Sequence, residues 1–447
     1  MAEADRISAL PVDIKVSILS RLVVKDAVRT SALARSWRHL WTLLPCLRLG
    51  YVGDKLGVTT GSRWLERVHH LVSSLKGPLV DLELFHSGFH SLHKNVSPLI
   101  HRLLDLLLQK GGLEKLSLYI ETHGQPPVLI HLPYFPHLKV LRLDCCHLVL
   151  PAGFQGFNRL TTLTLKYAKI SNDDLHVLIH TSPNLTTLSM FDIVPSTVPL
   201  SLNISMPLLK YLEFRINVPG EKVSVISAPS LEEAHFNYLR CSDGSLNMAQ
   251  ATLRLVMSVA TVSTLNLSFD VLKYFSLVTL PCNFTFPRLR CLKLSLLINA
   301  NINKRTHDAF IWFLRSMPLL EELELLLSSY TSLNNRAAIQ LKDLLAKNNN
   351  AFFCLNQTLK TVRINTGYLD DVITGITLVK FFLLNAKVLK LMKIACWESY
   401  GMQPSFQARM IEEMPKVEVS SDAKVIFEDI TAYEYYSTTP EWFYDWN

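Results

Sequence analysis

The clearest candidate for a metal site in the sequence is a group of three histidines. His86, His90 and His93 are four and three residues apart, a spacing that would place three imidazoles on one face of a helix, and imidazole is a common zinc ligand. Gly88 interrupts any helix over this stretch, and no cysteine or carboxylate joins the histidines. A transition-metal site needs more ligands than this group offers. We therefore expect no metal and no cofactor.

Acid–base chemistry has equally few candidates. His176 and His180 form a pair one helical turn apart, which we expect at the surface. Glu321, Glu322 and Glu324 would alternate between the faces of a strand, so they indicate a solvated surface rather than an acid–base pair. The sequence has no GxGxxG, phosphate-binding-loop or GxSxG motif, and no nucleophile is paired with a base. We therefore expect no catalytic residue and a protein that is not an enzyme.

The composition indicates a large folded protein. Of the 447 residues, 49% are hydrophobic and 19% are charged, which excludes a disordered chain and a mini-protein held by disulfides. Leucine makes up roughly one residue in six, well above ordinary usage. The net charge of +7 is uneven, because nine acidic residues and two lysines give residues 411–447 a charge of −7 and leave +14 on residues 1–410. The chain is a basic body with an acidic end.

Targeting signals and cysteine usage indicate an intracellular protein, in the nucleus, the cytoplasm or both. The N-terminus, MAEADRISALPVD, lacks the basic and apolar regions of a secretory signal. No apolar run approaches the roughly 18 residues that a membrane span needs, so we expect no membrane association. The eight cysteines show no CxxC spacing, which favours reduced thiols.

One pattern, LxxLxL with substitutions, recurs from residue 79 onward. Between the copies that start at Leu113 and Leu231 the steps are 22 to 25 residues, within the period of leucine-rich repeats, and later steps are 27 to 39 residues. Both residues of LxL point to one side of a strand, and stacked copies form a continuous core. We predict an α/β leucine-rich-repeat solenoid with parallel strands and with helices on its convex side. The copies begin at Leu79, Leu113, Leu138, Leu160, Leu185, Leu209, Leu231, Val262, Leu289, Leu320, Leu359 and Ala386.

The residue inside each LxL should point away from the core and form an exposed strand face. Along the chain this face reads as small and neutral in the middle and as basic near the C-terminal end, except for Glu324. We expect it to bind a target. The candidate contact residues are Arg142, Lys166, Tyr211, Arg215, Lys293, Arg363 and Lys390.

Residues 5–50 have a different pattern, typical of short helices. Ile14 and Ile18 fall on one helical face. We expect a second helix with Asp26 as its N-cap and an end at Pro45, which lacks the amide donor that a helix needs; the pattern leaves a break near Ser36 open. So small a block cannot bury two tryptophans and this many leucines by itself. The next domain or another protein must cover part of its apolar surface.

This block resembles the plant form of the F-box motif. The matching features are LP at Leu10-Pro11, ILSRL at residues 18–22, KDAVRTS at 25–31 and SWRHLW at 36–41. The resemblance implies a three-helix module that docks onto the Skp-type adaptor of a cullin–RING (SCF) ubiquitin ligase. The residues expected to contact the adaptor are Leu10, Pro11, Ile14, Ile18, Leu19, Leu22, Val28, Leu33, Trp37, Leu40 and Trp41.

The C-terminal part resembles the FBD region of plant F-box/FBD/LRR-repeat proteins. The best match is GITLVKFFLLNAKVLKLM within residues 359–396, and PKVEVSSDAKVIFED at 415–429 is similar to the closing strand of that region. We expect residues 423–427 to cap the repeats, and the aromatic, acidic tail either to cap them or to compete with targets. The expected domains are an F-box (1–50), a connecting segment (51–78), leucine-rich repeats (79–358), FBD-like repeats with a closing strand (359–430) and the tail (431–447).

The resemblance implies a non-catalytic, substrate-recognition subunit of an SCF ubiquitin ligase. The F-box would bind the adaptor, and through it the cullin and RING subunits, while the solenoid would bind a target protein for ubiquitination and proteasomal degradation. Two other functions stay open. One is an adaptor-independent interaction scaffold in which the F-box block only caps the solenoid. The other, less favoured, is nucleic-acid binding by the basic body, for which no reading helix is apparent.

Overall fold

A computed structural model of the chain describes twelve stretches of sequence, in which helices and strands alternate. Contacts divide the chain into two compact units: the described residues up to 195 belong to unit 1, and those from 201 to 429 belong to unit 2. None of the described helices is long and apolar enough to cross a bilayer. The described residues are 7–52, 61–87, 96–121, 127–195, 201–216, 222–238, 246–267, 270–297, 304–328, 352–366, 372–396 and 423–429.

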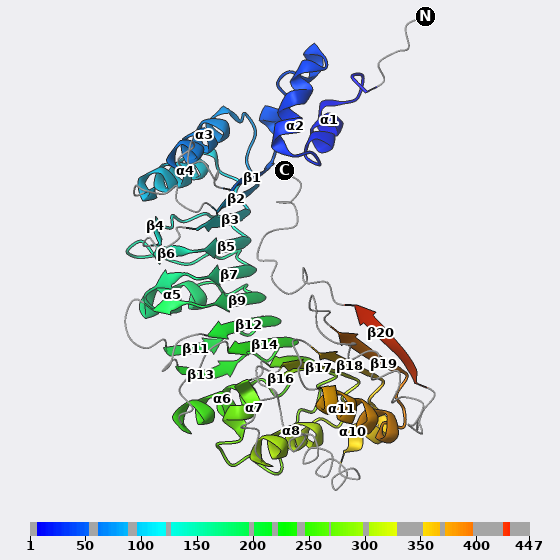
Figure 1. Ribbon diagram of the computed structural model, residues 1–447. Helices are drawn as coiled ribbons and strands as arrows, with labels where there is room; N and C mark the ends of the chain where they lie inside the picture. The colour runs from blue at the N-terminus through cyan, green and yellow to red at the C-terminus, as the bar shows by residue number, and fades with distance from the viewer. Residues whose placement is uncertain are drawn as a thin grey trace, which may run out of the picture. The chain divides into compact units, whose positions relative to one another are not determined.

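A small helical module opens unit 1, as the sequence predicts (Figure 1). Its second helix begins at Val24, two residues before the predicted N-cap Asp26, because the N–H groups of Asp26 and Ala27 both bond to the Val23 carbonyl at 3.0 Å. Its second half consists of short 3₁₀ turns rather than one continuous helix. The elements are α1 (Val12–Leu19), α2 (Val24–Arg29), η1 (Thr30–Ala32), η2 (Arg35–Trp37) and η3 (Leu40–Leu43).

The main sheet of unit 1 is parallel, and five of its six strands, β2 onward, are the predicted LxxLxL copies. Leu116, Leu141, Leu163 and Leu188 lie in register on successive strands and are fully buried. The alternate side chains point to the opposite face, so the period-two reading of the pattern is confirmed. The strands, in spatial order, are β1 (Cys46–Val52), β2 (Asp81–Ser87), β3 (Lys115–Ile120), β5 (Val140–Asp144), β7 (Thr162–Lys166) and β9 (Thr187–Phe191).

Strand β1 is a further copy of the repeat, beyond the twelve predicted from the sequence. Leu44, Leu47 and Leu49 have the LxxLxL spacing, and all three are buried. The sequence pattern predicts Leu44 at the end of a helix, because Pro45 follows it. The repeats therefore begin before residue 50, inside the block expected to be F-box alone.

The backbone joins the helical module directly to the repeats. The Thr42 carbonyl accepts a hydrogen bond of 2.8 Å from Lys76 N–H, and the Pro45 carbonyl accepts bonds of 2.7 and 3.1 Å from the N–H groups of Val80 and Asp81. Leu44 packs with Leu19 in the core of the module and is also the first leucine of the β1 repeat. The module and the first repeat consequently share a core residue.

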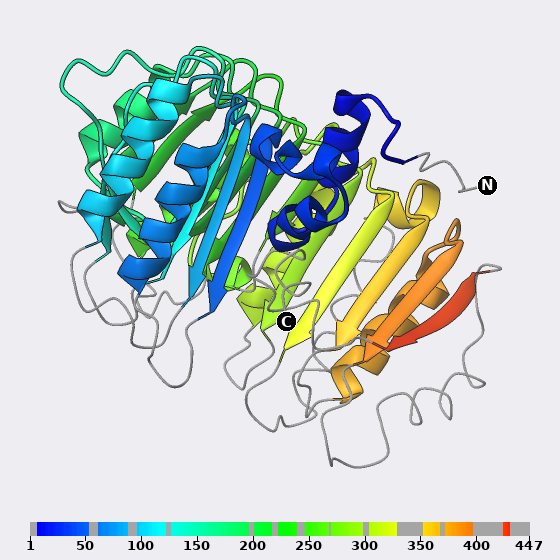
Figure 2. The same ribbon diagram turned by 90° about the horizontal axis from the view of Figure 1, so that it is seen from above.

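Helices and a second small sheet cover the other face of the unit 1 sheet, and Figure 2 shows the helices on that side. The edge strand of the small sheet is closed by side chains of α4: Leu129 N–H donates to Ser97 Oγ, and His131 N–H donates to His101 Nε2, both at 3.0 Å. The elements of this layer are α3 (Gly61–Ser74), α4 (Ser97–Lys110), α5 (Asn172–His180), β4 (Val128–His131), β6 (Cys146–Val149), β8 (Lys169–Ile170) and β10 (Val194–Pro195).

Unit 2 repeats this plan with a parallel sheet and helices on one side of it (Figure 1). Its sheet strands are β12 (Tyr211–Ile216), β14 (Glu233–Tyr238), β15 (Thr264–Leu267), β16 (Cys291–Leu297), β17 (Glu322–Ser328), β18 (Thr361–Thr366), β19 (Leu391–Cys396) and β20 (Lys424–Asp429). Strands β11 (Ser201–Ser205) and β13 (Lys222–Ser227) pair separately. The helices are α6 (Leu246–Ser258), α7 (Asp270–Phe275), α8 (Lys304–Ser316), α10 (Phe353–Gln357) and α11 (Val372–Asn385).

The closing strand predicted within residues 415–429 is present as β20. It pairs in parallel with β19, from Leu391↔Lys424 to Cys396↔Asp429. Residues 415–422 and the tail at 431–447 lie outside the described residues.

Candidate functional site

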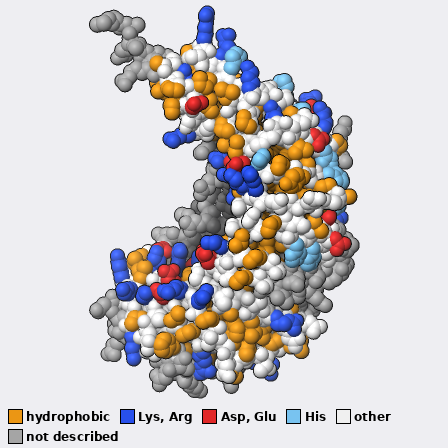
Figure 3. All heavy atoms as spheres, turned by 180° about the vertical axis from the view of Figure 1, so that it is seen from behind, with side chains coloured by type: hydrophobic (Ala, Val, Ile, Leu, Met, Phe, Trp, Pro, Cys, Tyr) orange, Lys and Arg blue, Asp and Glu red, His pale blue; other side chains and the backbone are white. Residues whose placement is uncertain are grey.

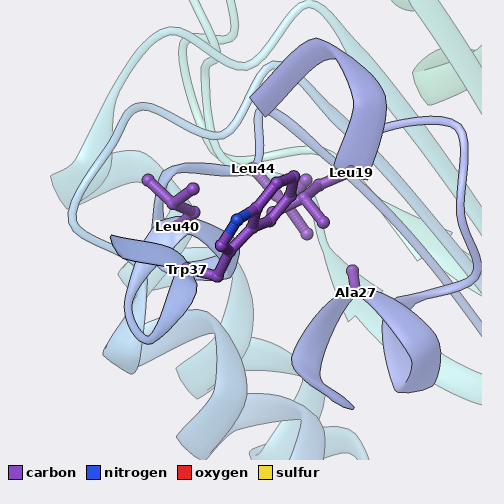
Figure 4. Packing of buried hydrophobic residues seen from close by; sticks show 5 residues of the cluster. All are labelled: Leu19, Ala27, Trp37, Leu40 and Leu44. Atoms are coloured by element: carbon purple, nitrogen blue, oxygen red, sulfur yellow. The ribbon is translucent and has the colours of Figure 1, made fainter. Parts of the chain in front are cut away.

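The helical module has its own small core. Trp37 lies at its centre and packs with Leu19, Ala27, Leu40 and Leu44 (Figure 4). The indole N–H of Trp37 donates a hydrogen bond of 3.1 Å to Ser8 Oγ. Because α1, α2 and the 3₁₀ turns each contribute to this cluster, the core fixes how the rest of the module's surface is presented.

Large apolar side chains also lie exposed on the module, and Figure 3 shows hydrophobic atoms gathered on its surface. Ile14, Ile18 and Leu22 are 39% to 48% exposed, Leu33 is 73% exposed, and Pro11 is exposed beside them. Exposed apolar clusters of this kind mark sites of protein contact. These five members of the predicted adaptor-binding set are therefore available to a partner.

The remaining members of the predicted set divide into two groups. Leu19, Trp37 and Leu40 are buried inside the module, so their assignment as direct contacts is wrong. The 3₁₀ turns change the phase that a continuous helix would have given, and this turns Trp37 inward. Leu10, Val28 and Trp41 are half-buried.

Two exposed apolar residues of the module were absent from the predicted set. Ile7 is 61% exposed and Val12 is 50% exposed. Both flank Pro11 at the start of α1, so their apolar type beside the LP dipeptide was the available signal. Lys15, also on α1, is buried with its ammonium 5.8 Å from the centre of the Trp37 ring.

The helix-free face of the unit 1 sheet carries aromatic and charged side chains. Tyr119 is half-buried and stacks on the buried Phe85, with their ring centres 4.4 Å apart. Arg142 is exposed at the middle of β5, and within the described residues it forms no ion pair. Lys166 lies with its ammonium 4.8 Å from the centre of the Phe191 ring. Arg142 and Lys166 thus lie on the predicted face, and Arg142 is the cation there that is available to a target.

An acidic group lies at the end of the same face. Glu121 Oε2 accepts hydrogen bonds from Ser87 Oγ at 2.7 Å and from Tyr119 Oη at 3.2 Å. Burial raises the pKa of Asp144 to about 6, although a bond from Cys145 Sγ opposes this rise. Burial also raises the pKa of the Cys145 thiol. A protonated thiol is a poor nucleophile, so this group offers polar contacts rather than covalent chemistry.

The first strand of unit 2 carries two of the predicted contact residues. Tyr211 Oη donates a hydrogen bond of 2.9 Å to Glu213 Oε2, and its ring lies 4.9 Å from that of His235. Arg215 is half-buried further along β12. Both predicted residues thus lie on the helix-free face, although Tyr211 is held by neighbours within the sheet.

The basic end of the strand face is largely neutralised in the folded chain. Lys293 lies 3.0 Å from Glu324, and Glu428 of β20 lies 3.2 Å from Arg363 and 2.8 Å from Lys393. Figure 3 shows Lys, Arg, Asp and Glu side chains intermingled in this part of unit 2. The prediction that this end is basic is therefore wrong, because Glu324 of the adjacent strand pairs with Lys293, and Glu428, two strands away, pairs with Arg363.

Lys390 does not lie on the strand face, so the prediction that it is a contact residue of that face is wrong. The AKVLKL copy also fits three residues later, as LKLMKI, and the structure uses that register: Leu389, Met392 and Ile394 are buried. Lys390 precedes β19 and bonds through its N–H to the Lys360 carbonyl at 2.8 Å. Lys393 takes the position inside the LxL.

The histidine candidates do not form the helical group considered from the sequence. His86 lies on β2 rather than on a helix, and its ring stacks on Tyr51 at 5.0 Å. His90 and His93 lie outside the described residues. Burial lowers the pKa of His86 to about 4, so it is a neutral core residue at pH 7. In the part of the chain that the structure describes, no group of three His, Cys, Asp or Glu side chains could hold a metal.

A cavity of about 610 Å³ lies in unit 2 between α8 and the segment after α7. Trp312 lines it and donates a hydrogen bond of 2.9 Å to the Pro281 carbonyl, while Arg305 and Asp308 add charge. None of the predicted contact residues lines this cavity.

Three family models match the chain. The model of the F-box domain matches residues 7–49, the model of the LRR repeats of FBD-associated F-box protein At5g56370 matches residues 100–324, and the FBD model matches residues 349–394. Together with the helical module and the stacked parallel strands, these matches define an F-box protein with leucine-rich repeats.

Curated proteins of Arabidopsis thaliana are similar to parts of the chain. F-box/FBD/LRR-repeat protein At1g13570 is 33% identical over 46% of this chain and 48% of its own length. F-box/LRR-repeat protein At4g14096 is 28% identical over 60% of this chain and 63% of its own length. The matched part thus spans less than two thirds of either relative. The chain belongs to the plant F-box/FBD/LRR-repeat family.

Proposed function

We propose that this protein is the substrate-recognition subunit of an SCF ubiquitin ligase. Its F-box binds a Skp-type adaptor, and through it the cullin and RING subunits, while the strand face binds a protein that is then ubiquitinated and degraded by the proteasome. The observation that carries the proposal is the exposed apolar surface of the F-box. Ile14, Ile18 and Leu22 lie exposed there although the module has a complete core of its own.

The charge of the F-box supports a protein partner of acidic character. Arg21, Lys25 and Arg38 are exposed on the module, with Asp13 and Asp26 as the exposed acids. A basic rim around an apolar centre speeds the encounter with an acidic partner and contributes to specificity. Burial of the apolar centre then supplies most of the affinity.

Target binding fits the helix-free face of the unit 1 sheet. The half-buried Tyr119, which stacks on the buried Phe85, the exposed Arg142 and the polar end around Glu121 offer aromatic, cationic and hydrogen-bonding contacts on this face. Aromatic and arginine side chains dominate binding energy at protein interfaces. The protein itself is non-catalytic in this role, acts in the nucleus or cytoplasm, and leaves ubiquitin transfer to the other subunits.

The adaptor-binding surface is tested with the full chain and a Skp-type adaptor co-expressed with it. We expect Ile14→Asp combined with Ile18→Asp to abolish co-purification of the adaptor, because two charges would enter the apolar centre of the contact. The pair Leu10→Ala and Pro11→Ala should have the same effect. Undiminished binding by both double variants, with the fold intact by circular dichroism, contradicts the proposal.

A matched control separates loss of the surface from general damage. Leu108 on α4 is 41% exposed, similar to Ile14 and Ile18, but lies away from the module. Leu108→Asp should leave adaptor binding unchanged. If Leu108→Asp also abolished binding, the contact would not be specific to the F-box surface.

The target surface is tested by proximity labelling in plant cells under proteasome inhibition. The wild-type chain is compared with Arg142→Glu and with Tyr119→Ala. Proteins that lose labelling in both variants, while the adaptor is still labelled, are the targets held by this face. Labelling that is identical in all three chains would place target recognition elsewhere.

A further inference from the structure

Strand β20 is the last described strand of the unit 2 sheet, and one of its edges has no strand beside it among the described residues. Within the described residues, β20 pairs with β19 alone. Lys424 N–H bonds to the Lys390 carbonyl at 2.9 Å, so the amide of Lys424 points toward β19. Because successive amides of a strand point to opposite sides, the N–H and C=O groups of Val425 and Phe427 point to the open edge. These groups are ready to pair with another strand.

The apolar side chains of β20 are also incompletely covered. Met392 and Ile394 of β19 are fully buried, as are Val362 and Ile364 of β18. Their counterparts in register on β20, Val425 and Phe427, are only half-buried. The last repeat of a solenoid needs a cap, since it has a neighbour on one side only. Among the described residues, none of the strands or helices supplies such a cap for β20.

We propose that two copies of this chain pair through β20, edge to edge and antiparallel. In the register that places Ile426 opposite Ile426 of the second copy, Val425 lies opposite Phe427 and Lys424 lies opposite Glu428. The segment KVIFE is thus complementary to itself when reversed. Each Lys–Glu contact occurs twice about the two-fold axis, as an isologous dimer requires.

The register agrees with the direction of the amides. Val425 and Phe427 direct their N–H and C=O groups outward, so they form the hydrogen-bonded pairs of the new ladder. Ile426, whose amide points toward β19, falls in the non-hydrogen-bonded pair at the axis. If the register of the two β20 strands shifted by one residue, amides that point outward would lie opposite amides that point toward β19. Side chains on the core side would then also lie opposite side chains on the other face of the sheet.

Charge complementarity favours a second copy over an unrelated strand. Edge strands are usually protected from pairing by charged side chains, and Lys424 is such a residue when β20 is alone. In the dimer the same lysine meets Glu428, which already lies close to Arg363 and Lys393. The dimer concerns unit 2 only, and it does not depend on adaptor binding.

Cysteine cross-linking of the full chain tests the register directly. In a non-hydrogen-bonded antiparallel pair the Cα atoms are about 4.5 Å apart, which a disulfide can bridge. Ile426→Cys should therefore give a disulfide-linked dimer on mild oxidation. Lys424→Cys is the matched control: its two copies would lie roughly 13 Å apart, four strand residues, and should not cross-link above the wild-type background.

Light scattering after gel filtration, over about a hundredfold range of concentration, tests the dimer itself. The wild-type chain should change from one-chain to two-chain mass. Lys424→Glu, which places two glutamates opposite each other, should raise the dissociation constant of the dimer about tenfold or more. Phe427→Pro, which removes an outward N–H, should also weaken it. Lys387→Glu, the same charge change at an exposed site before β19, should leave the dimer unchanged.

Three outcomes would overturn the proposal. They are a one-chain mass for the wild type at every concentration, equal cross-linking of Ile426→Cys and Lys424→Cys, and a dimer that tolerates both Lys424→Glu and Phe427→Pro. The first would leave the edge to a strand of a different protein.

Discussion

His101 Nε2 accepts a hydrogen bond of 3.0 Å from the backbone N–H of His131. Only a neutral imidazole nitrogen can accept, so His101 carries its proton on Nδ1. Burial and the neighbouring His131 both lower the pKa of His101, which agrees with this role. A helix side chain thus takes the place of a neighbouring strand along the edge of β4.

Replacement of His101 by alanine should loosen this edge. The His131 N–H would lose its acceptor, and we expect the free energy of unfolding to fall by about 1 kcal/mol. Hydrogen exchange at the His131 amide should become faster. His101→Gln, which keeps an acceptor, should be milder. Ser97→Ala is the control and should affect the Leu129 amide instead. An unchanged His131 exchange rate in His101→Ala would refute this account.

The stability of unit 1 should fall in mild acid because of His86. Burial holds the pKa of His86 at about 4, below its ordinary value of 6.5, so the fold favours the neutral ring. The contribution of neutral His86 to the free energy of unfolding is complete above pH 6.5. It is lost as the pH falls toward 4, at about 1.4 kcal/mol per pH unit. Urea unfolding at pH 7, 5.5 and 4.5 measures this loss.

Trp37→Ala should destabilise the F-box by about 3–5 kcal/mol, because it removes the largest side chain of the module's core. Trp37→Phe should cost less, since it keeps most of the packing and loses only the bond to Ser8. Adaptor binding should decline in parallel with thermal stability. A Trp37→Ala chain that is as stable as the wild type but does not bind would instead make Trp37 a direct contact.

Gly156→Ala should be more harmful than Gly153→Ala. Both glycines have positive φ, +85° and +75°, which costs another residue about 1 kcal/mol. A Cβ on Gly156 would also lie 1.8 Å from the Thr181 carbonyl oxygen, whereas a Cβ on Gly153 would meet nothing within 4 Å. We expect an additional loss of about 1–3 kcal/mol for Gly156→Ala alone. Equal urea midpoints for the two variants would contradict this.

The strand face was predictable because it depends on spacing alone. Arg142 and Tyr211 lie on the face that the period of two assigns to them. The predictions were wrong where two structural interpretations of the same residues fit the sequence equally well. AKVLKL and LKLMKI overlap, and only pairing with β18 selects the second, which moves Lys390 off the face. Leu44 fits both a helix end and a repeat start, so β1 was missed.

Residue type alone could not predict which apolar side chains of the F-box are buried and which are exposed. Trp37 and Leu33 are both large and apolar, yet the first is buried and the second is 73% exposed. The sequence left open a break in the helix near Ser36, and the structure has it at Ala34, whose extended backbone resets the phase between Leu33 and Trp37. In the same way, the neutralisation of Arg363 depends on Glu428, which is 65 residues away and reaches it only because β20 follows β19.

The sharing of Leu44 between the F-box core and the first repeat has a mechanical consequence. The carbonyls of Thr42 and Pro45 accept hydrogen bonds from backbone N–H groups within residues 76–81. The module and β1 are therefore not joined by a flexible hinge. A load on the F-box is transmitted to the sheet rather than absorbed by a hinge. The two parts should therefore unfold in a single thermal transition. An adaptor bound to the module would hold the neighbouring strands at a constant angle.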